Sequence, residues 1–272
     1  MTFPGLLLYV VQKGANVADS KPLISGNWKM NCNHLEAIQL VQKLDFKLQS
    51  KDYDRVEICV HPPFTDLRSI QTLIDGDKMS LKLGAQNCSW FESGAYTGEV
   101  SPSMLAKLNV SYVIVGHSER RELFGETDEI VRKKLEAVLR HNMSPILCVG
   151  DTLEEYETEK TQDKVFFQIQ SGLKGLSFEQ LSKVVVAYEP IWAIGTGHNA
   201  TPSQAQATCS FIRSIISDLG GSEAASVVRI QYGGSVRPGN AHDLLSQPDI
   251  NGLLVGSASL DADSFAEIIN FA

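Results

Sequence analysis

The chain has 272 residues, of which 43% are hydrophobic and 21% are charged, and its formal net charge is −8 at pH 7. This composition supplies a substantial core and argues against global disorder. The acidic balance, without a long basic run, argues against nucleic acid or an anionic membrane as the main partner. The five cysteines are scattered without a Cys-x-x-Cys pair, which indicates a reduced, cytoplasmic protein with neither a disulfide scaffold nor a zinc site.

The chain begins with a short apolar run at residues 6–11, far shorter than a membrane span. No basic segment precedes the run and no good cleavage site follows it, so a secretory signal is disfavoured. We expect residues 1–20 to be an N-terminal extension, disordered or an artefact of the assigned start, and residues 21–272 to form a single catalytic domain.

Short apolar runs rich in β-branched residues recur along the chain and predict eight strands. Most of these runs are continuously apolar rather than alternating, as expected for parallel strands that are buried on both faces. The predicted strands span residues 23–26, 56–60, 81–85, 112–115, 146–149, 184–188, 229–232 and 252–255.

Helical patterns separate the predicted strands. Residues 34–48 carry apolar side chains at Leu35 and onwards with a period near 3.6. Thr201, followed by a proline and then Gln204, has the residues of a capping box, and Ser101-Pro102 is a second helix start. Strands alternating with helices predict an α/β fold, a closed (β/α)8 TIM barrel. The alternative is an open doubly wound sheet, which would prefer a glycine fingerprint that residues 26–29 lack.

Active sites of such barrels lie at the C-terminal ends of the strands, so the residues that follow each strand are the candidates. Asn27 and Lys29 follow the first strand, His117 and Glu119 the fourth, Glu189 the sixth, Gly234 and Ser235 the seventh, and Gly256 and Ser257 the eighth. Polar groups at one end of an apolar cylinder face a common pocket.

Glu189 is the candidate general base, because a carboxylate at an apolar strand end is partly withdrawn from water. The residues after it, 190–197, are mostly apolar, with Pro190 at one end and Gly195 and Gly197 at the other. This composition suits a lid that excludes water on closing. From this pattern alone, a solvated glutamate before an ordinary surface loop is an equally good interpretation.

His117 precedes a predicted short helix, whose N-terminus disfavours an imidazolium, so we expect a neutral hydrogen-bond donor to a carbonyl oxygen. Lys29 supplies a positive charge that the chain as a whole lacks. Glu119 would orient Lys29, pair with Arg120 or Arg121, or remain a solvated surface charge.

The glycine-containing turns after the seventh and eighth predicted strands favour a phosphate site. Their backbone N–H groups can approach an anion closely, and these two loops are the usual place for a phosphate in this architecture. Simple tight turns are the alternative.

Four segments together resemble the signature motifs of the triosephosphate isomerase family, in that family's order. They are residues 26–31 (GNWKMN), 115–121 (VGHSERR), 187–197 (AYEPIWAIGTG) and 231–236 (QYGGSV). The similarity runs from about residue 21 to the C-terminus, and the set is highly specific.

The resemblance implies interconversion of dihydroxyacetone phosphate and glyceraldehyde 3-phosphate through an enediol(ate), with no metal and no cofactor. It assigns proton abstraction to Glu189 and carbonyl polarisation to His117, with Lys29 and Asn27 stabilising the oxyanion. Glu119 would support Lys29. Phosphate binding is assigned to the backbone of Gly195, Gly234, Ser235 and Gly256, with Ser257 beside them.

The family resemblance also implies a homodimer. Residues 86–98 form a long segment without helical periodicity, which needs a reason, and it resembles the family's protruding loop, with Thr97 entering the partner subunit near Lys29. Cys32, three residues beyond Lys29, is expected near that contact.

Two positions in the resembling region depart from the family pattern. Ser257 stands where a second glycine is usual, and a left-handed backbone there would strain it. Asp151 replaces a glutamate that contacts the lid tryptophan, here Trp192, and the shorter side chain is expected to loosen that contact.

Two other functions remain open at this point. A different phosphate-binding barrel, such as a sugar-phosphate epimerase, would share the phosphate turns but not the combination of Lys29, His117 and Glu189. A catalytically inactive phosphosugar-binding scaffold would be favoured by the loss of Glu189 or Lys29, and both are present.

Overall fold

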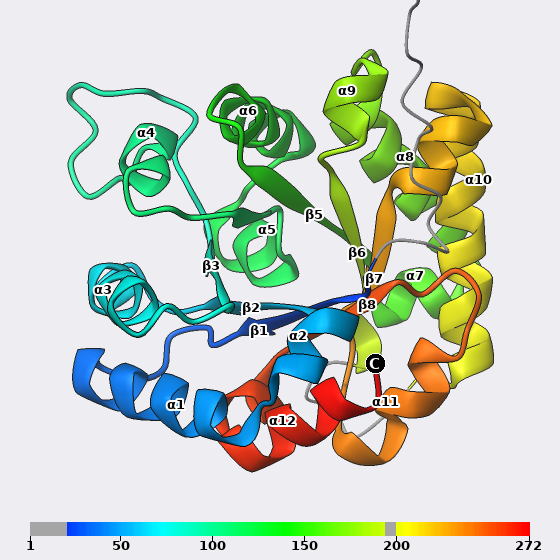
Figure 1. The fold of residues 1–272 in the computed structure, drawn as a ribbon. Helices are drawn as coiled ribbons and strands as arrows, with labels where there is room; N and C mark the ends of the chain where they lie inside the picture. Colours follow the sequence, from blue (N-terminus) through cyan, green and yellow to red (C-terminus); the bar gives the residue numbers. More distant parts are fainter. Residues whose placement is uncertain (1–20, 194–199) are drawn as a thin grey trace, which may run out of the picture.

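A computed structural model of the chain describes residues 21–193 and 200–272, and within them eight parallel strands form a closed ring (Figure 1). The strands are β1 (Leu23–Asn27), β2 (Glu57–His61), β3 (Lys82–Ala85), β4 (Tyr112–Val115), β5 (Ser144–Asp151), β6 (Val185–Pro190), β7 (Arg229–Tyr232) and β8 (Gly252–Val255). The expectation for residues 1–20 lies outside the described residues, as do most of the predicted lid and Gly195.

Closure of the ring depends on β1, which pairs with two neighbours. Leu23 lies opposite Glu57 of β2 on one side and Gly252 of β8 on the other. An open doubly wound sheet would leave two free edges, so that alternative is excluded, and the predicted (β/α)8 barrel is confirmed.

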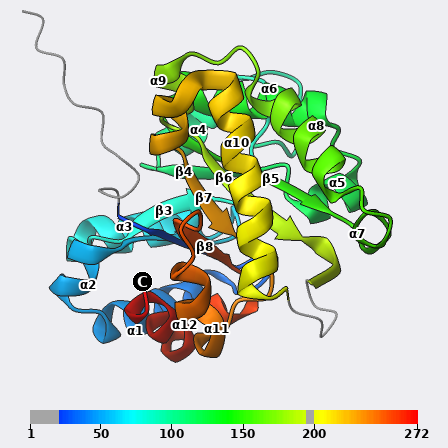
Figure 2. The same cartoon turned by 90° about the vertical axis from the view of Figure 1, so that its right-hand side faces the viewer.

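Helices surround the strands on the outside, with α10 running along the barrel beside α8 (Figure 2). The helices are α1 (His34–Lys47), α2 (Ser50–Arg55), α3 (Leu67–Asp77), α4 (Pro102–Ala106), α5 (Ser118–Phe124), α6 (Asp128–Arg140), α7 (Leu153–Glu157), α8 (Thr161–Leu173), α9 (Phe178–Leu181), α10 (Pro202–Val227), α11 (Pro238–Leu245) and α12 (Ala262–Asn270), with 3-10 turns η2 (Ile191–Ala193) and η3 (Ser257–Leu260).

The predicted helix starts are confirmed at α4 and α10. The Ser101 side chain accepts from the Met104 backbone N–H, and the Thr201 side chain accepts from that of Gln204. The inward face of α1 differs from the sequence prediction at one position: Leu35, in its first turn, is 60% exposed.

Four strands run past their predicted C-terminal ends: β1 and β2 by one residue each, and β5 and β6 by two. β5 and β6 stay paired from Ile146 opposite Val185 to Asp151 opposite Pro190. The prediction ended both strands early because their last residues include charged side chains. Glu189 and Asp151 therefore lie on paired strand backbone rather than in a loop, and such backbone holds a side chain in a defined position.

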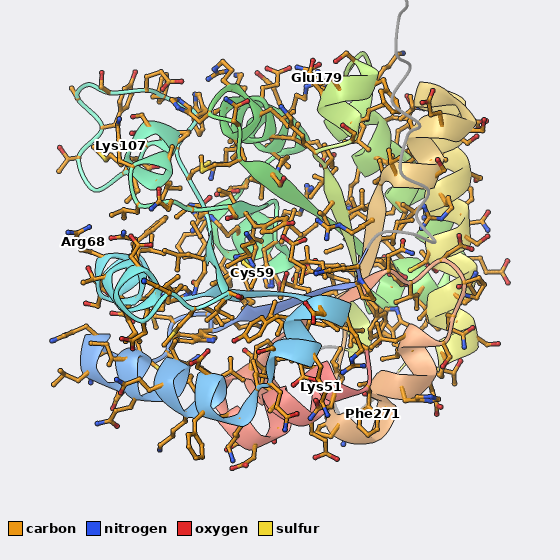
Figure 3. The ribbon with its side chains drawn as sticks, viewed as in Figure 1. Lys51, Cys59, Arg68, Lys107, Glu179 and Phe271 are labelled. Carbon is orange, nitrogen blue, oxygen red and sulfur yellow. The ribbon has the colours of Figure 1, made fainter. Side chains whose placement is uncertain are left out.

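The core has an outer layer between strands and helices and an inner layer that fills the barrel. The inner layer contains Leu23, Cys59, Tyr112, Ile114, Ile146, Cys148, Val185, Ala187 and Leu254. Figure 3 shows Cys59 inside the barrel and Lys51 on its outer surface. All five cysteines are free thiols. Within residues 21–193 and 200–272, helices with the length and apolarity for crossing a membrane are absent.

Candidate active site

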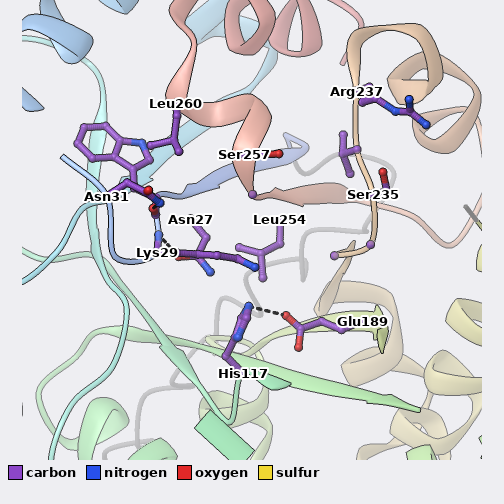
Figure 4. Close-up of a pocket in the computed structure, with 15 residues that line it drawn as sticks. Asn27, Lys29, Asn31, His117, Glu189, Ser235, Arg237, Leu254, Ser257 and Leu260 are labelled. Carbon is purple, nitrogen blue, oxygen red and sulfur yellow. Dashed lines mark hydrogen bonds and ion pairs between the residues drawn. The ribbon is translucent and has the colours of Figure 1, made fainter. Parts of the chain in front are cut away.

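A cavity of about 590 Å³ opens at the C-terminal ends of the strands (Figure 4). Most of the residues predicted from the sequence line it: Asn27, Lys29, His117, Glu189, Gly234, Ser235, Gly256 and Ser257. The motifs also contain four further lining residues, Trp28, Asn31, Gly233 and Val236, whereas Arg237, Leu254 and Leu260 were not singled out by the sequence. The strand order therefore brings together side chains that are up to 230 positions apart, from Asn27 to Ser257.

Lys29 occupies a left-handed backbone conformation, with φ of 54°. This conformation costs a non-glycine residue on the order of 1–2 kcal/mol. Three contacts hold it there. The Gln86 side chain donates from Nε2 to Lys29 O at 2.7 Å, Lys29 N donates to Asn27 Oδ1 at 3.1 Å, and Lys29 Nζ lies 2.6 Å from Glu119 Oε1.

Glu119 had three possible partners in the sequence, and the described structure pairs it with Lys29. Arg120 pairs instead with Glu126, and Arg121 with Asp128. Gln86 donates a hydrogen bond to the Lys29 backbone. The sequence did not predict this role, because its only indication was that Gln86 directly follows the third predicted strand.

His117 is the N-cap of α5, and its Nδ1 accepts a hydrogen bond from the Glu119 backbone N–H at 3.2 Å. An acceptor nitrogen carries no proton, so the ring proton is on Nε2 and the imidazole is neutral. Nε2 faces the cavity and lies 3.1 Å from Glu189 Oε1, although the two are not aligned as a hydrogen bond.

Glu189 is almost fully buried, with 2% of its surface exposed, yet it lines the cavity. Its Oε2 accepts from the Ser118 backbone N–H at 3.0 Å. Two glycines leave room for it: a Cβ on Gly150 would overlap Glu189 O, and one on Gly233 would lie 3.1 Å from Glu189 Cγ. The absence of a side chain at Gly233 therefore leaves the space that the Glu189 side chain occupies.

The loop after β7 is shaped by its own contacts. A Cβ on Gly234 would overlap the Tyr232 hydroxyl, so only glycine fits. Asn240 in α11 donates to Ser235 O at 2.9 Å and accepts from Arg237 N at 2.8 Å, which braces the loop from both sides.

The turn after β8 is less constrained. Gly256 has φ of −84°, and the atom nearest to a Cβ placed on it would be Lys29 Cε at 3.8 Å. Ser257 is not among the residues with positive φ. The strain anticipated for a serine at this position is therefore absent.

The family profile and the similar proteins reported below all carry the same family name. The sequence profile of the family described as Triosephosphate isomerase matches residues 22–272. The triosephosphate isomerase of Saccharopolyspora erythraea is 58% identical over 91% of this chain and 95% of its own length, and that of Streptomyces coelicolor is 55% identical over 92% and 97%. This chain belongs to the triosephosphate isomerase family.

A neutral histidine at the end of the fourth strand is the established pattern of the family and is not peculiar to this chain. Here its cause is visible in the contact between His117 Nδ1 and the Glu119 N–H, which fixes the tautomer.

Asp151 stands where the resemblance leads us to expect a glutamate, and the structure shows what this shorter carboxylate contacts. Its carboxylate is fully buried and accepts from the Tyr188 hydroxyl at 3.0 Å, the Thr161 hydroxyl at 2.6 Å and Trp192 Nε1 at 3.3 Å. Burial raises the pKa of Asp151, while these hydrogen bonds lower it. The contact with Trp192 persists at the long end of the hydrogen-bond range, and Thr161, which the sequence did not single out, donates to the same oxygen.

The segment from Gln86 to Gly98 leaves the barrel as an irregular loop beside α4 (Figure 1). Thr97 is exposed, and Phe91 and Tyr96 stack with ring centroids 3.9 Å apart. Met30, next to Lys29, is 95% exposed. Cys32 is half-buried with φ of 70°, and burial is the main cause that raises its pKa.

Proposed function

We propose how the residues of this cavity carry out the reaction that its family membership assigns. The chain is an intramolecular oxidoreductase, an aldose–ketose isomerase: it interconverts dihydroxyacetone phosphate and D-glyceraldehyde 3-phosphate, a step of glycolysis and gluconeogenesis. The reaction moves one proton between adjacent carbons, while the carbonyl oxygen gains and then loses negative charge.

The proposal depends chiefly on one observation: Glu189 Oε1 and His117 Nε2 lie 3.1 Å apart in one cavity. Glu189 takes the carbon-bound proton, and the C–H electron pair becomes the C=C bond of the enediolate. His117 donates from Nε2 to the oxygen on which charge develops. Glu189 then returns the proton to the neighbouring carbon. The hydroxyl of the enediolate gives its proton to His117 Nε2, which replaces the proton already donated to the other oxygen, so that one hydroxyl becomes the new carbonyl and the old carbonyl becomes a hydroxyl.

Lys29 and Asn27 stabilise the oxyanion from the β1 side of the cavity. Glu119 holds the ammonium of Lys29 at 2.6 Å, and Gln86 holds its backbone. A charge whose position is set before the reaction does not have to move when the oxyanion forms. Groups held in place in this way stabilise a developing charge most effectively. Glu119 thus acts on the substrate through Lys29.

The phosphate lies at the other end of the cavity, against the loops after β7 and β8. Backbone N–H groups of Gly234, Ser235 and Gly256, and the neighbouring Ser257, bind its oxygens. The braced loop around Ser235 and the open space at Gly256 support this assignment. Gly195, outside the described residues, completes the proposed phosphate contacts.

We further propose that residues 21–272 act as one catalytic domain in a cytoplasmic homodimer. The exposed loop around Thr97 and the almost fully exposed Met30 beside Lys29 support a subunit contact at this face. Sedimentation velocity of the purified chain tests it: a species of twice the chain mass is expected, and a monomer at micromolar concentration would contradict the dimer.

A coupled assay with glyceraldehyde 3-phosphate tests the activity itself. We expect turnover without added metal or cofactor. A folded sample that binds phosphate but does not turn the substrate over would favour the phosphosugar-binding scaffold. Lys29→Met, which keeps the length of the side chain, is expected to lower kcat/KM by at least about 100-fold, and retention of full activity would contradict the role of Lys29.

A further inference from the structure

Arg237 lines the active-site cavity but has no part in the chemistry derived above. It is exposed, and Figure 4 shows it beyond Ser235 at the outer rim, with its guanidinium pointing away from Lys29, His117 and Glu189. With respect to residues 21–193 and 200–272, its side chain forms neither an ion pair nor a hydrogen bond. Among the described residues, its positive charge is therefore uncompensated, and it lies beside the loop that we assign to the phosphate.

Local structure does not explain an arginine at this position. Arg237 is the N-cap of α11, where serine, threonine, aspartate and asparagine are favoured. Its side chain makes no capping hydrogen bond, and a cation next to the positive end of a helix is electrostatically unfavourable. A residue that opposes the local preference of its element, at the rim of an active site, indicates a functional reason.

The charges inside the cavity do not by themselves attract a phosphate, so a free cation at the rim has a function to perform. The Lys29 ammonium is paired with the Glu119 carboxylate at 2.6 Å, so this pair carries no net charge toward a distant ligand, and Glu189 adds a negative charge to the same cavity. The chain as a whole carries a formal net charge of −8. A phosphate dianion approaching this surface meets a repulsive field, except where a free cation offsets it.

We propose that Arg237 is the steering cation of this enzyme: it attracts the phosphate group of the incoming triose phosphate and raises the rate of association. It does so at the rim, without contacting the reacting atoms. This inference rests on the proposed function. The family is a standard example of catalysis near the diffusional ceiling, a regime in which kcat/KM responds directly to the rate of encounter.

The size of the effect follows from the charges. A unit positive charge and a dianion about 10 Å apart in water attract with an energy equivalent to about a fourfold change in encounter rate. Salt screens this attraction, because the Debye length falls from about 30 Å at 0.01 M to about 8 Å at 0.15 M ionic strength.

The test compares Arg237→Gln with wild type by measuring kcat/KM for glyceraldehyde 3-phosphate from low to high ionic strength. After screening, we expect a loss of about threefold at 0.01 M that shrinks to less than about 1.5-fold at 0.3 M, with kcat unchanged. Arg237→Lys, which keeps the charge, should restore the wild-type profile. Arg237→Glu changes the charge by two units, so its fold-loss in kcat/KM should be roughly the square of that of Arg237→Gln.

Lys51→Gln is the matched control, because it changes the net charge equally. Lys51 is an exposed residue on α2, which precedes β2 and so lies toward the opposite end of the barrel. This variant should follow the wild-type profile at every ionic strength.

Two results would overturn the proposal. One is a kcat/KM of Arg237→Gln equal to wild type at low ionic strength. The other is a loss that persists at high ionic strength and includes kcat, which would indicate direct contact with the bound substrate. An inactive, folded wild type would contradict the isomerase activity instead, so the two failures are distinguishable.

Discussion

The two ends of the barrel both carry charged side chains, but they use them differently. At the N-terminal end, the first residues of three strands meet. Arg229 of β7 donates to Glu57 of β2 at 2.7 Å and to the hydroxyl of Tyr112 of β4 at 2.5 Å. Both terminal nitrogens of the Arg229 guanidinium have an acceptor, and the cluster links three strands at this end of the barrel.

At the C-terminal end, charged groups remain available to a ligand. Glu189 Oε1 is buried without an aligned hydrogen-bond donor, and Lys29 is held in a left-handed conformation. Satisfied polar groups at one end stabilise the fold, whereas incompletely satisfied and strained groups at the other end are typical of a site that binds and reacts. Charged residues that stabilise the fold therefore lie at one end of the barrel, and those that carry out the chemistry lie at the other.

The largest expected effect comes from removing the base at the C-terminal end. Glu189→Gln keeps the shape of the side chain and an acceptor for the Ser118 N–H, but it cannot take a proton. We expect kcat to fall about 1,000-fold, or about 4 kcal/mol in activation free energy, with the thermal unfolding midpoint nearly unchanged. Steady-state kinetics checks this, and a near-wild-type kcat would show that another group is the base.

Acidification should weaken the C-terminal end through His61, the fully buried last residue of β2. The His61 carbonyl accepts from Gln86, the residue that also holds Lys29. Burial lowers the pKa of His61 to about 4, whereas an unfolded histidine titrates near about 6.5. Below that pH the unfolded state binds the proton first, so stability is lost as the pH falls toward 4.

The predicted loss from His61 between pH 6.5 and pH 4 amounts to about 3 kcal/mol in the free energy of unfolding. Denaturant titrations at a series of pH values measure it. His61→Gln, which does not titrate, should show a correspondingly shallower pH dependence than wild type. Parallel pH curves for the two proteins would contradict the assignment.

Breaking the cluster at the N-terminal end should affect stability and leave the chemistry intact. Arg229 is 17% exposed, and Arg229→Met removes the donor to both Glu57 and Tyr112. We expect about 2–3 kcal/mol of lost stability, because the partners stay partly buried, with kcat of the folded enzyme unchanged.

Denaturant unfolding and kinetics measure the two consequences of Arg229→Met separately. The control is Lys133→Met, which removes an exposed ion pair with Glu129 on α6 and should leave stability nearly unchanged. A fall in kcat for Arg229→Met would show that the two ends are coupled.

The smallest effect is expected at the phosphate end. Because Ser257 has no positive φ, Ser257→Gly relieves no backbone strain. We expect the inhibition constant of inorganic phosphate to change by less than about tenfold, or about 1.4 kcal/mol. A larger change would show that the serine side chain itself contributes to binding.

Much of the fold could be predicted from the sequence because its signals are local. Continuous apolar runs mark strands buried on both faces, and the caps at Ser101 and Thr201 mark helix starts. The largest errors in the strand bounds occur where charge interrupts the pattern: the last residues of β5 and β6 are paired strand, although Asp151 and Glu189 are polar. At these positions the hydrogen bonds between β5 and β6 keep the chain in a strand, although the local composition predicts a loop.

The sequence by itself determined the barrel class, the family and the candidates Lys29, His117 and Glu189, because these follow from short motifs and periodicity. Only the tertiary structure decided which partners these residues have. The Gln86 contact with Lys29 spans 57 positions, that of Ser118 with Glu189 spans 71, and that of Arg229 with Glu57 spans 172. Ring closure brings such positions together, and no local pattern encodes a contact between segments so far apart.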